Sequence, residues 1–142
     1  MSESTATTVA LRGLSTVTLW ADDVSAATDW YTGVLGTEPY FVRPEAPESP
    51  LYVEFRLGDN HDELGILDRR FAPARASAEI GGAVVYWHAD DARATYQRLL
   101  DAGASSYEPP VEREAGFVTA SVVDPFGNVL GVMYNPNWVE NS

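Results

Sequence analysis

Histidine is the residue type in this sequence best suited to acid–base chemistry, and the chain has only two, His61 and His88. An imidazole titrates near neutral pH and can act as a general acid or base. We expect His61 to be solvated, because it lies in the polar turn Gly58–Asp62. His88 follows an apolar stretch and is the candidate acid or base. The sequence shows no paired carboxylate or nucleophile beside it.

The residue types alone give little support for a metal-binding site. A site built on the two histidines would need Glu54 or Glu63 as a further ligand, in an unusual geometry. The chain contains no cysteine. This excludes a disulfide framework, a thiolate metal site and a cysteine nucleophile.

Two similar strand–helix units position these residues. Ser15–Ala21 alternates apolar and polar residues and predicts a strand, and Asp22-Asp23 predicts the start of a helix that runs to about Leu35. Ala83–Ala89 predicts a second such strand, and Asp90-Asp91 the start of a helix over residues 92–102. Each helix is followed by a glycine, which commonly ends helices.

The other segments predict mainly strands and turns. Val118–Met133 predicts a hairpin around the turn Asp124-Pro125-Phe126-Gly127-Asn128. Residues 71–82 predict a crossing loop or short helix, and residues 135–142 a tail with one apolar anchor, Trp138. The remaining expected strands are Glu38–Val42, Leu51–Leu57, Glu63–Leu67 and Ser106–Val111.

Composition places the chain among ordinary globular proteins. Its 142 residues predict one domain, residues 1–142, and 45% of them are hydrophobic. A formal net charge of −12 argues against nucleic acid and anionic membrane surfaces as partners, and is compatible with a cationic ligand. The N-terminal residues lack a signal-peptide pattern, and no apolar run is long enough to span a membrane. We therefore expect a cytoplasmic protein.

The two units form an internal repeat. The first covers about residues 14–70 and the second about residues 82–134, each with the pattern βαβββ. We expect an α+β fold in which two βαβββ repeats form paired, curved mixed sheets around a cavity. At one fixed offset Val17 matches Val85, Ala21 matches Ala89, Asp22 matches Asp90, and Asp23 matches Asp91.

The segment Val17–Gly36 and the turn Asp124–Asn128 resemble the vicinal oxygen chelate superfamily. That superfamily has the glyoxalase-like fold and includes glyoxalase I, extradiol dioxygenases, fosfomycin-modifying enzymes and bleomycin-resistance proteins. The resemblance covers residues 14–134. It implies metal ligands, where a member uses a metal, at positions that carry Thr16, Gly65, Val84 and Gly131 here. None of these side chains holds a divalent ion well, so we expect no metal and no other cofactor.

Strand alternation predicts a mixed aromatic and hydroxyl-bearing pocket surface. Such a surface suits a small organic ligand that is cationic or aromatic and binds by stacking with a few hydrogen bonds. For Trp20 and Tyr86 the alternative is a packed core. The expected ligand-binding residues are Thr16, Thr18, Trp20, Tyr86, His88, Thr119, Ser121 and Met133.

Two function classes follow from this pocket. The first is a metal-independent binding protein of the bleomycin-resistance type that sequesters a drug-like or natural-product ligand. The second is a metal-free isomerase, lyase or cyclase that uses His88 as acid or base. A metal-dependent lyase or dioxygenase is a third, weaker alternative. We also expect a homodimer, with Trp138 and the tail as candidate contacts.

Overall fold

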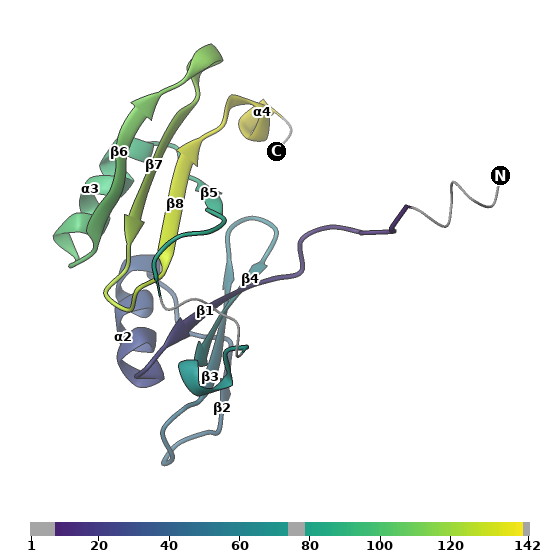
Figure 1. The fold of residues 1–142 in the computed structure, drawn as a ribbon, viewed down its shortest axis with the longest axis vertical. Helices are drawn as coiled ribbons and strands as arrows, with labels where there is room; N and C mark the ends of the chain where they lie inside the picture. The colour runs from purple at the N-terminus through teal and green to yellow at the C-terminus, as the bar shows by residue number, and fades with distance from the viewer. Residues whose placement is uncertain (1–7, 74–78, 141–142) are drawn as a thin grey trace.

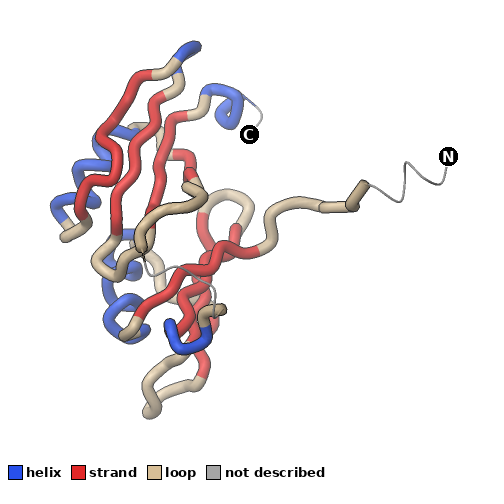
Figure 2. The backbone as a smooth tube through the Cα atoms, viewed as in Figure 1, coloured by secondary structure: helices blue, strands red, loops and turns tan. Residues whose placement is uncertain are grey.

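The chain folds into two four-stranded sheets, each backed by a helix (Figures 1 and 2). A computed structural model describes residues 8–73 and 79–140. The strand order is β1-β4-β3-β2 in one sheet and β5-β8-β7-β6 in the other. The first unit comprises β1 (Thr16–Ala21), α2 (Val24–Leu35), β2 (Phe41–Arg43), β3 (Tyr52–Leu57) and β4 (Asp62–Asp68). The second comprises β5 (Tyr86–His88), α3 (Ala92–Asp101), β6 (Ser105–Glu112), β7 (Val118–Val123) and β8 (Val129–Tyr134).

Both sheets are mixed, as the repeat predicts. In each unit the first strand runs parallel to the last, and the other neighbours are antiparallel. The α+β fold with two βαβββ units is thus confirmed. The sheets stay open instead of closing into a barrel, and Figure 1 shows them one above the other along the long axis of the molecule.

The two helices begin at equivalent aspartates. Asp23 caps α2 by accepting a hydrogen bond from the backbone N–H of Ala26 at 3.0 Å, and Asp91 caps α3 through the N–H of Ala94 at the same distance. A carboxylate here accepts from an N–H that has no partner within the helix. Gly36 ends α2 with φ of 71°, a backbone conformation that favours glycine.

Alternation along β1 separates a core face from an open face. Val17, Leu19 and Ala21 are buried, whereas Thr16, Thr18 and Trp20 are wholly or partly exposed on the other face. Buried side chains of both units, including Tyr31 and Leu130, belong to one hydrophobic cluster. The helix-side faces therefore supply a common core, and the opposite faces are left for other contacts.

Several expected boundaries differ from the structure. Strand β5 covers only Tyr86–His88, although hydrogen bonds from Gly131 N to Val85 O and from Ala89 N to Met133 O continue its pairing with β8. Strand β2 begins at Phe41, later than predicted. The crossing stretch contains a short helix, η1 (Arg69–Phe71), and residues 74–78 lie outside the described residues.

The tail contains a helical turn that the sequence reading did not predict. Helix α4 covers Pro136–Glu140, and the side chain of Asn135 accepts hydrogen bonds from the backbone N–H groups of Asn137 and Trp138. A second short helix, η2 (Glu114–Gly116), joins β6 to β7. Within the described part of the chain, no helix is long and apolar enough to cross a membrane.

The outer edge strands of the two sheets are irregular. At one edge, β2 has three residues. At the other, β6 contains Pro109 and Pro110, and its register with β7 shifts on both sides of Glu108. Proline lacks a backbone N–H and is tolerated in a strand mainly at an edge.

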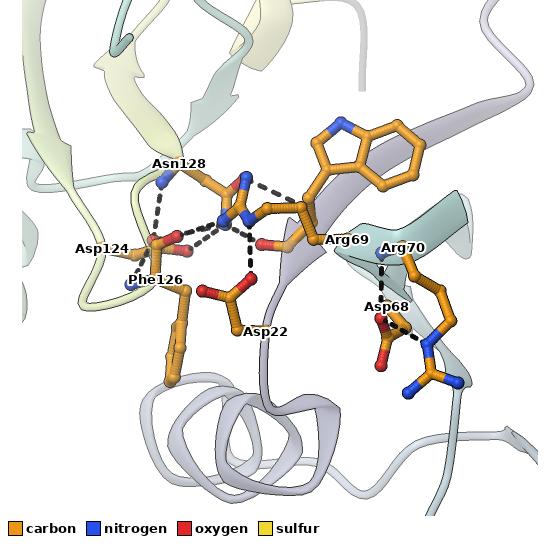
Figure 3. A network of polar contacts seen from close by, with 8 residues as sticks. Asp22, Asp68, Arg69, Arg70, Asp124, Phe126 and Asn128 are labelled. Carbon is orange, nitrogen blue, oxygen red and sulfur yellow. Dashed lines mark hydrogen bonds and ion pairs between the residues drawn. The ribbon is translucent and has the colours of Figure 1, made fainter. Parts of the chain in front are cut away.

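The Asp124–Asn128 turn joins the second unit to the first (Figure 3). Asp124 Oδ1 accepts from the backbone N–H groups of Phe126 at 2.9 Å and Asn128 at 2.8 Å. Asp124 Oδ2 accepts from the Tyr31 hydroxyl at 2.5 Å. Burial, followed by the Asp124 carboxylate, raises the pKa of Tyr31 well above its ordinary value. The phenol is therefore a stable hydrogen-bond donor at neutral pH.

Asn128 and Arg69 extend this junction. The Asn128 amide donates to Trp20 O at 2.9 Å and accepts from Trp20 N at 3.1 Å, so it pairs with the β1 backbone as a neighbouring strand would. Arg69 donates to Asp22 at 3.0 Å and to Phe126 O at 2.8 Å (Figure 3). The turn that the sequence predicts as a hairpin connection is thus also the main polar contact between the units.

Candidate ligand-binding site

A cavity of about 420 Å³ lies where the two units meet. Its walls come from β1, from the segment that leads into β5, and from the turn between β7 and β8. The predicted ligand residues Thr16, Thr18 and Trp20 all line it. Asn128, whose amide pairs with the Trp20 backbone, also belongs to the wall and fixes this part of β1.

The open face of the first sheet carries an aromatic ring at its centre. Gly65 on β4 lies between Thr18 on β1 and Glu54 on β3. A Cβ atom at Gly65 would lie 2.9 Å from the Cε1 and hydroxyl oxygen atoms of Tyr52. The glycine therefore makes room for the Tyr52 ring, which covers a position where the family resemblance implies a metal ligand.

Two carboxylates flank this ring. The Tyr52 hydroxyl donates to Glu54 at 2.5 Å, and the Thr16 hydroxyl donates to Glu63 at 2.9 Å. Burial, and then the hydrogen bond to Glu54, raise the pKa of Tyr52. Both glutamates are half-buried, and each is bonded to a neutral hydroxyl.

No basic side chain in the described part of the chain forms an ion pair with either glutamate. Arg56 lies opposite Glu63 in the strand register. Its guanidinium group instead lies 3.6 Å from the centre of the Tyr40 ring and donates to the Tyr40 hydroxyl. The open face of the first sheet thus combines aromatic surface with two carboxylates, while Arg56 on the same face contacts Tyr40.

The other five predicted ligand residues lie on the second sheet. Tyr86 and Ser121 flank Gly131, and His88 and Thr119 flank Met133. A Cβ atom at Gly131 would lie 2.8 Å from both the Tyr86 ring and the Val85 carbonyl oxygen. Gly131 thus accommodates Tyr86 much as Gly65 accommodates Tyr52. The eight predicted residues form two groups on two sheets, and only the β1 group lines the 420 Å³ cavity.

His88 has partners at both ring nitrogens. Its Nδ1 accepts from the backbone N–H of Asn135 at 3.2 Å, which places the proton of the neutral ring on Nε2. Nε2 lies 3.0 Å from a carboxylate oxygen of Asp90. The imidazole stacks on Trp138 with 4.4 Å between ring centroids, and its side chain is only 7% exposed. Through these contacts to Asn135 and Trp138, His88 holds the C-terminal tail against strand β5.

The residues at the implied metal positions do not fit a divalent ion. Thr16 donates its hydroxyl to Glu63, and Gly65, Val84 and Gly131 offer no side-chain donor. Among the described residues, no group of three or more histidine, cysteine, aspartate or glutamate side chains is arranged to hold a metal. We therefore assign no metal-dependent step to this site.

Sequence reasoning missed Tyr52 and Glu54 as residues of the open face. The alternation of β3 carries the relevant signal, because buried Val53 and Phe55 leave Tyr52, Glu54 and Arg56 on the other face. The sequence alone suggests Glu54 and Glu63 only as auxiliary metal ligands. Their hydrogen bonds to hydroxyl groups require three strands to be in register, which the sequence alone does not give.

The sequence matches the family described as the Glyoxalase/Bleomycin resistance protein/Dioxygenase superfamily over residues 13–132. Comparison with curated proteins finds no match.

Solved structures with this fold include proteins described as enzymes and as resistance-type proteins. A lactoylglutathione lyase from Agrobacterium tumefaciens is 22% identical with a TM-score of 0.66, covering 91% of this chain and 98% of its own. A glyoxalase-related enzyme from Fulvimarina pelagi is 18% identical with a TM-score of 0.68, covering 89% of this chain and 90% of its own. A glyoxalase/bleomycin resistance protein from Catenulispora acidiphila is 22% identical with a TM-score of 0.60, covering 87% and 100%. At these identities the likeness shows the fold alone.

Proposed function

Because the chain belongs to the glyoxalase/bleomycin resistance protein/dioxygenase superfamily, we propose that it binds and sequesters a small, cationic aromatic molecule without a metal ion. The ligand would be of a drug-like or natural-product class. It would occupy the 420 Å³ cavity and the adjoining open face of the first sheet. The observation that carries this proposal is the pair of half-buried carboxylates, Glu54 and Glu63, beside aromatic rings on that face.

The chemistry of this face favours a flat cation. Trp20 and Tyr52 offer aromatic surface for stacking, and such faces attract positive charge. Among the described residues, only hydroxyl groups donate to the side chains of these two carboxylates. A ligand cation would add an opposite charge there, and hydrogen bonds between two charged groups are strong. An anionic ligand would meet repulsion at these two carboxylates. Arg69, which also lines the 420 Å³ cavity, is ion-paired with Asp22.

The single experiment that tests the function is a thermal-shift screen of cationic, neutral and anionic aromatic compounds. A true ligand raises the melting temperature progressively as its excess over the dissociation constant grows. We expect the hits to be cationic. A screen in which anionic compounds dominate would contradict the proposal.

Truncation of Trp20 tests the position of the site. We expect Trp20→Ala to weaken binding of a screened ligand by about 1–3 kcal/mol, the scale of lost stacking and burial. The fold should persist because Trp20 lies on the cavity wall, outside the buried core. Phe71→Ala is the matched control, since it also removes a large aromatic side chain but does not line this cavity. Equal binding by wild type and Trp20→Ala, measured by calorimetry, would remove Trp20 from the site.

Metal content tests the metal-independent part of the proposal. We expect less than stoichiometric Ni, Zn, Mn or Fe in the purified protein after dialysis against a weak chelator. We also expect no glyoxalase or ring-cleaving activity when these ions are added. The reason is the absence of donors at Gly65, Val84 and Gly131. One retained metal ion per chain in elemental analysis would contradict this expectation.

We further propose that two copies associate, so that each covers open surface of the other. The segment before β1 carries Val9, Leu11 and Leu14, with exposed fractions of 78%, 86% and 74%. Figure 1 shows this segment leading away from both sheets. Its apolar side chains would be buried in a dimer. We expect sedimentation of the wild-type protein at micromolar concentration to give a dimer. The double variant Val9→Ser with Leu11→Ser should shift the equilibrium toward monomer. A wild-type monomer would contradict the proposal.

The metal-free enzyme with His88 as acid or base gains no support from the geometry. A general base needs a free nitrogen that can approach the substrate. Here Nδ1 accepts from a backbone N–H, and Nε2 faces Asp90. We therefore propose the binding function alone.

A further inference from the structure

On the helix side of the two sheets lies a second, partly open cavity of about 230 Å³, which shares Leu64, Trp87 and Leu130 with the walls of the 420 Å³ cavity. It lies between α2 and α3, and its walls include Tyr31, Leu64, Leu99 and Leu130, each no more than 9% exposed. Among the described residues, no aspartate, glutamate, lysine or arginine lines it. Its volume is sufficient for a benzene-sized group, since apolar cavities of roughly 150 Å³ accept one.

This chamber adjoins a pocket of about 260 Å³ with the opposite character. Leu57, Gly58, Trp87 and His88 belong to the walls of both, so the two spaces are neighbours. The outer pocket is otherwise lined by Asp59, Asn60, Asp62, Asp90 and Trp138. Among the residues that the structure describes, this pocket thus has three carboxylates and no lysine or arginine.

We propose that the chamber and this acidic mouth together bind a small amphiphilic amine, with its apolar group in the chamber and its ammonium group in the mouth. Burial of the apolar group supplies most of the affinity, because transfer of apolar surface out of water is the main favourable term in such a cavity. Trp87 and Trp138 present indole rings to the cation, and Asp59 and Asp62 supply negative charge. This site goes beyond the proposed function, since Trp20 and the open face of the first sheet take no part in it.

His88 forms part of the wall between the two spaces. Its Nδ1 accepts from Asn135 N, and its Nε2 faces Asp90. The ring thereby holds Trp138 at the mouth through their stacked contact.

Three probes with one apolar group test the proposal: 4-phenylbutylammonium, 4-phenylbutanol and 4-phenylbutyrate. In calorimetric titrations of the full chain at low ionic strength, we expect the cation to bind most tightly, the alcohol less tightly and the anion most weakly. We expect the cation to bind about tenfold more tightly than the anion, because the rim carboxylates are exposed and partly screened. Equal affinities, or tighter binding of the anion, would overturn the proposal.

Substitutions locate the two halves of the site. Asp59→Asn with Asp62→Asn should reduce the preference for the cation and leave binding of the alcohol unchanged. Asp29→Asn with Glu38→Gln is the matched control, because these exposed residues change the net charge equally and line neither space. An equal loss of preference in both double variants would show that net charge alone attracts the cation, and would overturn the acidic mouth.

Filling the 230 Å³ chamber with a larger side chain should lower the affinity for all three probes. Thr95 lines the chamber from a half-buried position on α3, and Thr95→Phe should lower affinity by about tenfold or more through loss of the apolar volume. If that variant does not fold, Val34→Phe fills the chamber from α2. Unchanged affinity in a folded filled variant would overturn the proposal.

The Trp20→Ala variant separates this site from the proposed function. Phenylbutylammonium should bind it as it binds wild type, whereas ligands of the 420 Å³ cavity should not. Loss of phenylbutylammonium binding in Trp20→Ala would place the amine in the first site and overturn the second. Failure of the thermal-shift screen would contradict the proposed function without affecting this titration.

Discussion

Replacing Asp124 by alanine is expected to lower the free energy of unfolding by about 3–5 kcal/mol, one of the largest effects of any single substitution in this chain. The carboxylate is 3% exposed. It accepts from the backbone N–H groups of Phe126 and Asn128 and from the Tyr31 hydroxyl. The alanine variant would leave these donors buried without their acceptor, and would loosen the turn that contacts β1. Urea titration of wild type and variant measures the difference.

The matched control is Asp91→Ala at the exposed start of α3. That change removes one capping hydrogen bond and should cost only about 1 kcal/mol. If both variants lose the same free energy of unfolding, the buried hydrogen bonds of Asp124 contribute no more to stability than one exposed helix cap, which would contradict the prediction.

The hydrogen bond between Tyr31 and Asp124 should also make the free energy of unfolding depend on pH. The pKa of Tyr31 is raised in the folded protein, first by burial and then by Asp124. Its contribution to stability is therefore full below about pH 10 and is lost as pH rises further, because the unfolded chain releases the phenolic proton more readily. Tyr31→Phe should lessen the alkaline loss of stability. An unchanged alkaline profile would contradict this assignment.

The second large effect is expected at Gly131. Gly131→Ala should destabilise the protein by about 1–3 kcal/mol, the usual range for overpacking. The added Cβ would lie 2.8 Å from the backbone oxygen of Val85 and from the Tyr86 ring. A ring can rotate away, but the carbonyl belongs to the segment hydrogen-bonded to β8 and must move with it. Thermal or urea unfolding, followed by circular dichroism, measures the loss.

Two other glycines provide graded controls. At Gly65 the added Cβ would meet only the side chain of Tyr52, so Gly65→Ala should cost less than Gly131→Ala. At Gly33, within α2, nothing lies within 4 Å of the added atom. Gly33→Ala should therefore stabilise the helix by about 0.5–1 kcal/mol. A different order of the three effects would contradict the packing described for Gly131.

The elements that the sequence predicts well are those determined by local chemistry. The β1 strand follows from alternation, and both helices follow from apolar spacing after Asp23 and Asp91. The hairpin follows from its turn residues. These signals lie within a few residues of one another, and hydrogen bonds within each element enforce them.

The site was harder to predict because its contacts join distant elements. Alternation placed Thr16, Thr18 and Trp20 on one face and Tyr86 on the corresponding face of the second sheet. It gives no information on how the two sheets lie relative to each other, and only the β1 group lines the large cavity. Likewise, the partners of His88 come from the backbone of Asn135 and from Trp138, in a short helix too weak in local propensity to be predicted.

The outer edges of the sheets also bear on how this protein behaves at high concentration. An exposed strand edge is a template for uncontrolled aggregation, because its free N–H and C=O groups can pair with another chain. Here β2 offers only three residues, and β6 presents Pro109 and Pro110 within a shifted register. Fibril growth by strand addition is therefore disfavoured at both outer edges of this acidic protein.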